Sequence, residues 1–232
     1  MPPGADSPAF FHLDLIMKKP ASVTRSAGFT LVELMVVIVI IIVLAAATFA
    51  ISTRVLTNSR LTASLGKVRD LGVRVENYTQ ENGGILPVYK DNSQDLYWWG
   101  MLVKDHRNES ELGVFESPGH KEFDVNKVET TISYGWNAHV CGRSEDNSAG
   151  EGPKRKASFK NPSQILVITE SPRTGGQGLF DESHLPDPKR YGGKAAALML
   201  DGTGKTLTIE SEFKRGTKWF LTEEEREAQG KQ

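Results

Sequence analysis

The chain has 232 residues, a mass of 25.6 kDa, a formal net charge of −1 at pH 7 and a pI near 6.5. This length allows one ordinary domain with an appendage, and the balanced charge gives no overall field that would attract nucleic acid or anionic lipid. The single cysteine, Cys141, excludes an intramolecular disulfide, so a packed core must hold the fold.

The first predicted element is an apolar helix over residues 29–51. In this segment of 23 residues Glu33 is the only charged side chain, and a helix of this length would run about 35 Å, enough to cross a hydrocarbon core of about 30 Å. Lys18, Lys19 and Arg25 precede it, which predicts a cytoplasmic N-terminus and an external C-terminal part by the positive-inside rule.

Three interpretations of this segment compete. A secretory signal peptide fits the basic start and the small residues at 45–47, but its apolar region usually has only about 7–15 residues. A plain membrane anchor explains the length, yet it gives no reason for a carboxylate at Glu33. A prepilin leader followed by a pilin helix is the third interpretation.

The stretch Arg-Ser-Ala-Gly-Phe-Thr-Leu-Val-Glu at residues 25–33 resembles the type III signal of type IV prepilins and type II secretion pseudopilins. The resemblance implies a leader at 1–28, cleavage between Gly28 and Phe29, and N-methylation of Phe29. It also implies that Glu33 acts in assembly, by pairing with the amine of a neighbouring subunit's Phe29. Because Met17 opens a basic stretch, translation from Met17 instead of Met1 is an open alternative.

The next predicted element continues the helix over residues 52–81 as an amphipathic half. Its apolar residues are spaced three or four apart, and Asn-Gly-Gly at 82–84 followed by Pro87 predicts its end. A short coiled coil is the alternative to packing on a sheet. The stripe consists of Val55, Leu61, Leu65, Val68, Leu71, Val75 and Tyr78.

Residues 82–221 are expected to form a globular periplasmic domain, and residues 222–232 a tail in which Thr222-x-x-Glu225 predicts a helix start. Strand-like runs at 132–136, 165–169, 195–200 and 206–209 predict a small antiparallel sheet with long loops. Asp201-Gly202 predicts a tight hairpin between the last two runs. The predicted fold class is therefore α+β and pilin-like, with one long N-terminal helix packed on that sheet.

The same hairpin imitates a phosphate-binding loop at Gly204-Lys205-Thr206. A Walker motif needs a glycine five positions before Gly204, but that position is Met199. It also needs a helix after the loop, where residues 206–209 have a strand pattern, so nucleotide binding is not expected.

Several short motifs resemble prepilin-type proteins of the planctomycete kind that carry a C-terminal H-X9-DG motif. Two positions depart from that pattern: Tyr191 stands where the family has histidine, and Ser117 where it has cysteine. Any role of those family residues is therefore in doubt, whereas Asp201 and Gly202 keep the motif. The other similar stretches are residues 81–87, 98–99, 114–118, 133–137 and 161–166.

Aromatic residues in these stretches, Trp98, Trp99 and Trp136, are expected to be core residues rather than a binding site. No catalytic motif is visible, so an enzyme is not indicated. Metal candidates are weak: one group has no zinc spacing, and the other lacks the spacing of a calcium loop. The first group is His120, His139, Cys141 and His184, and the calcium candidates are Asp181, Glu182 and Asp187.

The sequence therefore predicts a pseudopilin or minor pilin of a bacterial type II secretion or type IV pilus-like filament. The resemblance implies a single-pass inner-membrane protein whose partners are membrane lipid, a prepilin peptidase that also methylates, other pilin subunits, an assembly ATPase and its inner-membrane platform. No cofactor is expected apart from the weak calcium candidates. The rival hypothesis is a membrane-anchored periplasmic binding domain that never assembles. Its ligand surface would be the region of Trp98 and Trp99 and the acidic loop at residues 181–187.

Overall fold

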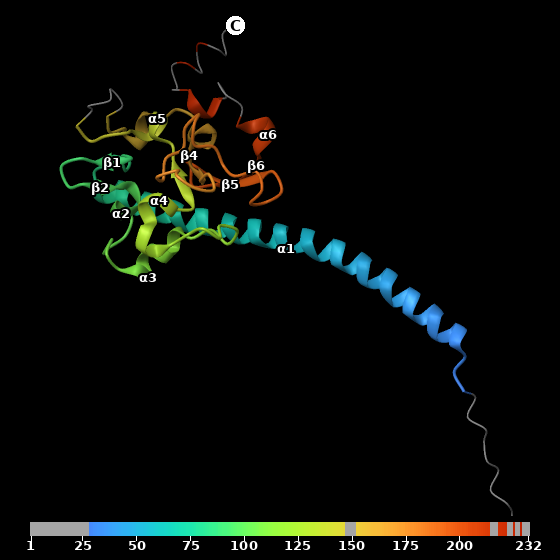
Figure 1. The fold of residues 1–232 in the computed structure, drawn as a ribbon. Coiled ribbons are helices and arrows are strands. Elements are labelled where there is room, and N and C mark those ends of the chain that lie inside the picture. Colours follow the sequence, from blue (N-terminus) through green and yellow to red (C-terminus); the bar gives the residue numbers. More distant parts are fainter. Residues whose placement is uncertain (1–27, 147–151, 214–217, 222–224, 226–227, 229–232) are drawn as a thin grey trace, which may run out of the picture. The chain divides into compact units, whose positions relative to one another are not determined.

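The computed structural model describes residues 28–146, 152–213, 218–221, 225 and 228. Its first element is a single helix, α1 (Leu31–Glu81), of 51 residues (Figure 1). The chain divides into two compact units, Met1–Ala47 and Thr48–Gln232. The predicted tail helix begins at Thr222, which lies outside the described residues.

Helix α1 ends where the sequence predicts. Gly83 and Gly84 have positive φ angles of 63° and 85°, which glycine adopts without steric cost. The Gly84 N–H donates to the Thr79 carbonyl at 2.8 Å, which is the six-to-one hydrogen bond of a Schellman cap. The Asn-Gly-Gly sequence therefore stops the helix by satisfying its last carbonyl groups.

The sheet of the second unit is antiparallel with the strand order β3-β4-β5-β6, so neighbours in the sequence are neighbours in the sheet. The predicted hairpin is confirmed as β5–β6, but Gly204 and Lys205 belong to β6 and not to the turn. A two-stranded ribbon, β1 (Lys90–Asp91) with β2 (Leu96–Tyr97), stands apart. The four main strands are β3 (Tyr134–Trp136), β4 (Leu166–Glu170), β5 (Lys194–Met199) and β6 (Gly204–Thr208).

Short helical turns fill the connections between the strands. They are too short to form layers of their own, and they serve to bring loops back to the core. The α-helical turns are α2 (Trp98–Met101), α3 (Glu109–Leu112), α4 (Val128–Thr131), α5 (Ala138–Cys141) and α6 (Ile209–Glu212). The 3-10 turns are η1 (Gly113–Phe115), η2 (Val125–Lys127), η3 (Lys156–Ser158), η4 (Pro162–Gln164) and η5 (Lys218–Phe220).

Both faces of the two central strands, β4 and β5, are buried. Along β5 and the residue after it, Ala196, Leu198 and Leu200 join the cluster that contains the α1 stripe, while Ala195 and Met199 join a second cluster. Alternate residues of a strand point to opposite faces, so one strand supplies two cores. A core on the sheet face opposite α1 was not predicted from the sequence. The second cluster is completed by Leu166, Phe180, Ala197, Leu207, Phe213, Trp219 and Phe220.

The amphipathic half of α1 packs into the core of its own chain, which answers the coiled-coil alternative for this segment. Its stripe residues Leu61, Val68, Leu71 and Val75 are buried in the first cluster. Close packing of this kind removes these four residues from any partner helix, whereas Val55 of the predicted stripe is 59% exposed.

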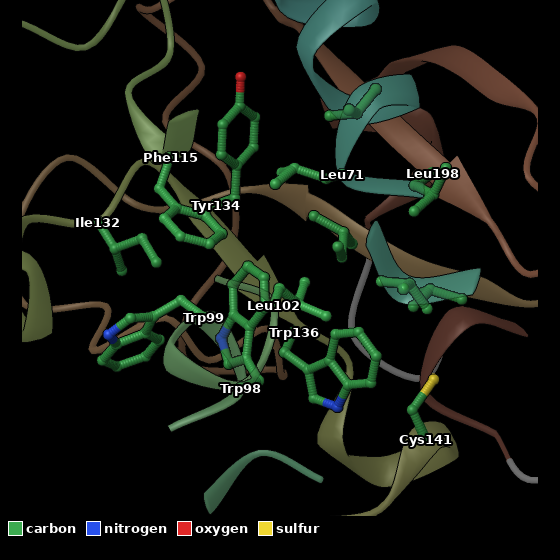
Figure 2. Close-up of a cluster of buried hydrophobic side chains, with 14 of the residues drawn as sticks. Leu71, Trp98, Trp99, Leu102, Phe115, Ile132, Tyr134, Trp136, Cys141 and Leu198 are labelled. Atoms are coloured by element: carbon green, nitrogen blue, oxygen red, sulfur yellow. The ribbon is translucent and has the colours of Figure 1, made fainter. Parts of the chain in front are cut away.

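An aromatic cluster forms the other part of this core (Figure 2). The rings of Trp98 and Trp136 stack with centroids 5.6 Å apart, and the Trp98 indole N–H donates to the Gly178 carbonyl at 2.8 Å. Trp98, Trp99 and Trp136 are all buried, which confirms that they are core residues. Trp98 and Trp99 therefore do not offer the ligand surface that the rival hypothesis needs.

Candidate membrane and assembly site

The first half of α1 exposes mainly apolar side chains. Among the described residues, α1 is the one helix long and apolar enough to cross a membrane, and none of its most apolar 18-residue window is buried. Phe29, before the helix, is 78% exposed and Ile42 is 61% exposed. Such an extended apolar surface needs lipid or other apolar helices around it.

A capping box begins the helix. The Thr30 hydroxyl accepts a hydrogen bond from the Glu33 N–H at 3.1 Å, and the Glu33 carboxylate accepts from the Thr30 N–H at 2.9 Å. The carboxylate also accepts from the Thr30 hydroxyl at 2.8 Å. These reciprocal bonds satisfy backbone donors that a helix start otherwise leaves unpaired.

This cap gives Glu33 a function within a single chain, which the sequence analysis did not consider. The signal was present as Thr30-x-x-Glu33, the usual spacing of a capping box. A plain membrane anchor therefore also has a use for this carboxylate, because it caps the helix start. A role of Glu33 in pairing with Phe29 of another subunit stays a prediction.

The predicted cleavage point lies just before this cap. Gly28 and Phe29 precede α1 and are not helical, whereas residues 1–27 of the predicted leader lie outside the described residues. A Cβ atom added at Gly28 would meet nothing within 4 Å, so local packing does not require glycine there. A small residue at this position would instead give a protease access to the peptide bond after it. Cleavage between Gly28 and Phe29 stays a prediction.

A long helix with a bare apolar first half, a second half packed on a small antiparallel sheet, and a capped polar start together define a pilin-like α+β protein. The family model of the prokaryotic N-terminal methylation motif matches residues 23–49, which is the prepilin-type signature. The chain thus carries a prepilin-type signature at the start of an apolar helix that is long enough to cross a membrane. No curated protein and no solved structure matches it.

The two positions that depart from the H-X9-DG pattern lie in contact. Tyr191 is 2% exposed, and its hydroxyl is hydrogen bonded to the Ser117 hydroxyl and accepts from the Gly119 N–H at 3.0 Å. A Cβ atom at Gly119 would come within 2.6 Å of the Tyr191 ring, so the ring seals this turn tightly. The pair therefore joins the turn after η1 to the approach to β5, and both departures serve one contact.

Asp201 and Gly202, the two residues that match the H-X9-DG pattern, form the β5–β6 turn. The Asp201 carboxylate accepts from the Thr203 N–H at 2.9 Å, and Gly202 has a φ angle of 85°. Hydrogen bonds from Thr203 hold the pKa of Asp201 below its usual range, although partial burial opposes them. In the described part of the chain, the side chain of Tyr191 makes no hydrogen bond to this turn.

A buried ion pair was missed by the sequence analysis. The Arg190 guanidinium donates to the Glu170 carboxylate at 2.7 Å, and both side chains are 1% exposed. The other Glu170 oxygen accepts from the Ser64 hydroxyl of α1, and Ser64 lies 3.1 Å from the Tyr134 hydroxyl. This network ties α1 to β3, β4 and the loop before β5, and no sequence motif marks it.

The metal candidates are engaged in hydrogen bonds instead. The Asp181 carboxylate accepts from the Ser183 N–H and from His184 Nδ1, both at 2.8 Å. Burial alone would raise the pKa of Asp181, but together the hydrogen bonds and the charge of His184 outweigh it, and the pKa lies below its usual value. His120 is held between the Ser133 hydroxyl and the Arg173 carbonyl, and burial lowers its pKa. Among the described residues no group of three His, Cys, Asp or Glu side chains is arranged to hold a metal ion. Calcium binding by Asp181, Glu182 and Asp187 stays a prediction.

Proposed function

We propose that this protein is a structural subunit, a pseudopilin or minor pilin, of a type II secretion or type IV pilus-like filament. The observation that carries the proposal is the methylation motif at residues 23–49 on a helix with an exposed apolar first half. The second half of that helix is occupied by its own sheet, so the first half is the part free to pack in a membrane or a filament.

The proposed sequence of events begins in the membrane with the N-terminus on the cytoplasmic side. A prepilin peptidase cuts between Gly28 and Phe29 and methylates the new amine of Phe29. The platform and ATPase of the machine then move the subunit from lipid into a filament, where Glu33 pairs with the amine of a neighbouring Phe29. A paired charge is tolerated in an apolar bundle, whereas an unpaired one is costly.

Mass analysis of the membrane-bound protein tests the processing step. Whether translation starts at Met1 or at Met17, cleavage after residue 28 leaves 232 − 28 = 204 residues, and the first peptide should begin with methylated Phe29. An uncleaved chain in cells with an active prepilin peptidase would favour the plain anchor. Loss of the whole apolar block would indicate a secreted protein.

The capping box supports a competing explanation of Glu33, in which the carboxylate only caps the helix of an anchor that never assembles. Two substitutions distinguish this explanation from charge pairing in a filament. Glutamine also completes a capping box, so Glu33→Gln keeps the helix start and removes only the charge. The filament proposal predicts that Glu33→Gln and Glu33→Ala are both inserted and cleaved, but neither is found in sheared or cross-linked filaments. Normal assembly of Glu33→Gln would show that the cap, and not the charge, is what matters.

A further inference from the structure

A shallow pocket lies beside the first turns of α1 that follow the apolar segment. Its volume is about 310 Å³, near the lower end of the range of about 300–1,000 Å³ usual for small-ligand sites. One wall comes from α1 and the other from the loop that leads into β5. The lining residues are Thr53, Arg54, Thr57, Asn58, Tyr191, Gly192 and Lys194.

The pocket is lined by cations and polar groups and contains no carboxylate. Arg54 and Lys194 approach it from opposite walls, and within the described part of the chain neither side chain has an ion-pair or hydrogen-bond partner. The Asn58 amide adds a donor. Two unpaired cations with a neutral donor form a suitable site for an oxyanion such as phosphate.

The loop wall is held firmly in place. Tyr191 is anchored below the pocket by its hydrogen bonds to Ser117 and Gly119, and Gly193 donates its N–H to the Pro188 carbonyl at 2.7 Å. Gly192 has a φ angle of 61°, which lets the loop turn beside α1 before Lys194 opens β5. The pocket is therefore preformed instead of depending on a mobile loop.

The position of the pocket along the chain indicates the source of the phosphate. Arg54 and Asn58 are the third and seventh residues after Ile51, where the apolar run ends. On a helix these positions lie about 4.5 Å and about 10 Å beyond it, and the headgroup layer of a bilayer is about 5–7 Å thick on each side. Arg54 thus lies at the level of the lipid headgroups, and Asn58 lies just beyond it.

We propose that this pocket binds the phosphodiester of a phospholipid headgroup, with preference for an anionic lipid, while the subunit is stored in the membrane. Arg54 and Lys194 contact the phosphate oxygens, and Asn58 donates to a remaining oxygen. The inference rests on the membrane anchoring of the proposed function, but it does not depend on leader cleavage or filament assembly. The near-neutral net charge of the chain does not oppose it, because the attraction is local.

Native mass spectrometry of the full chain, released from nanodiscs of equal phosphatidylglycerol and phosphatidylcholine, tests the proposal. The unmodified chain should retain phosphatidylglycerol preferentially. The double variant Arg54→Gln/Lys194→Gln should lose this preference by about tenfold or more, because it removes both charge-assisted hydrogen bonds to the phosphate. The matched control is Arg60→Gln/Lys189→Gln, which removes two exposed cations outside the pocket and should retain the lipid.

Equal retention by the pocket variant and the unmodified chain would overturn the proposal, and so would an equal loss in the control, which would indicate unspecific attraction. Displacement of the lipid by an excess of inorganic phosphate alone would show that free phosphate is the ligand. Thermal melting of both variants checks that they fold, and a folded pocket variant without lipid supports the site. Alkaline extraction of the chain from membranes would instead refute the anchoring itself, whereas failure of filament assembly alone would leave lipid retention intact.

Discussion

At the scale of single residues, the buried pair of Glu170 and Arg190 is expected to contribute strongly to stability. Arg190 also donates to the Ser133 carbonyl at 3.1 Å and the Pro172 carbonyl at 3.2 Å, so it holds two loops as well as the carboxylate. Removing one partner of a buried pair leaves an uncompensated charge and costs about 3–5 kcal/mol. We expect Arg190→Met to lower the free energy of unfolding by about this amount, measured by urea denaturation.

The loss in Arg190→Met should depend on pH. Burial raises the pKa of Glu170, and the Arg190 guanidinium opposes that rise, so its removal moves the pKa of this carboxyl further above the unfolded value of about 4.3. A group with a raised folded-state pKa contributes stability that is present below its unfolded pKa and is lost as the pH rises through the folded-state pKa. The variant should therefore be more stable near about pH 5 than near about pH 8.

An exposed pair of the same chemistry is the matched control. Arg173 donates to Glu122 at 2.8 Å, but its side chain is 66% exposed. Exposed pairs contribute about 0–1 kcal/mol, so Arg173→Met should change stability little at either pH. Equal losses in the two variants would contradict the assignment of the Glu170–Arg190 pair as a buried structural contact.

At the scale of secondary-structure elements, two glycines with opposite surroundings should respond oppositely to alanine. A Cβ atom at Gly66 in α1 meets nothing within 4 Å, so Gly66→Ala should stabilise the helix by about 0.5–1 kcal/mol. At Gly135 in β3 a Cβ atom would lie 2.7 Å from the Leu179 carbonyl oxygen, and backbone cannot easily move away. Gly135→Ala should therefore cost about 1–3 kcal/mol. Thermal melting of both variants tests the pair, and a stable Gly135→Ala protein would contradict this packing.

The sequence predicted those elements whose signal is local. The end of α1 follows from Asn-Gly-Gly, and the β5–β6 hairpin follows from Asp201-Gly202, because these residues set backbone angles by themselves. The second core was not predicted, since Phe180, Phe213 and Phe220 come from separate loops whose meeting depends on tertiary structure. The capping box at Thr30 was visible in the sequence and was overlooked.

For the whole molecule, the candidate site divides in the same way. The methylation motif could be recognised because a processing enzyme reads a contiguous stretch of sequence, and the match at residues 23–49 bears this out. The Ser117–Tyr191 contact and the pocket between Arg54 and Lys194 join residues that are far apart in the sequence. The spacing of residues along the chain therefore does not predict them. Sequence motifs therefore indicated the prepilin-type signature, whereas contacts between distant segments show how the second unit, Thr48–Gln232, is held together.

The division of labour along α1 makes a prediction for the whole chain. A shortened chain that begins at Ser52 loses only the exposed apolar half, and it keeps the buried stripe that includes Leu61, Val68 and Val75. We expect it to be a water-soluble monomer by gel filtration, with cooperative thermal unfolding. A chain that begins at Asn82 lacks the stripe and leaves the sheet's inner face uncovered, so it should aggregate or unfold, because each buried aliphatic side chain contributes about 1.5–3 kcal/mol. Cooperative folding of the Asn82 chain would show that α1 is only an anchor and not part of the core.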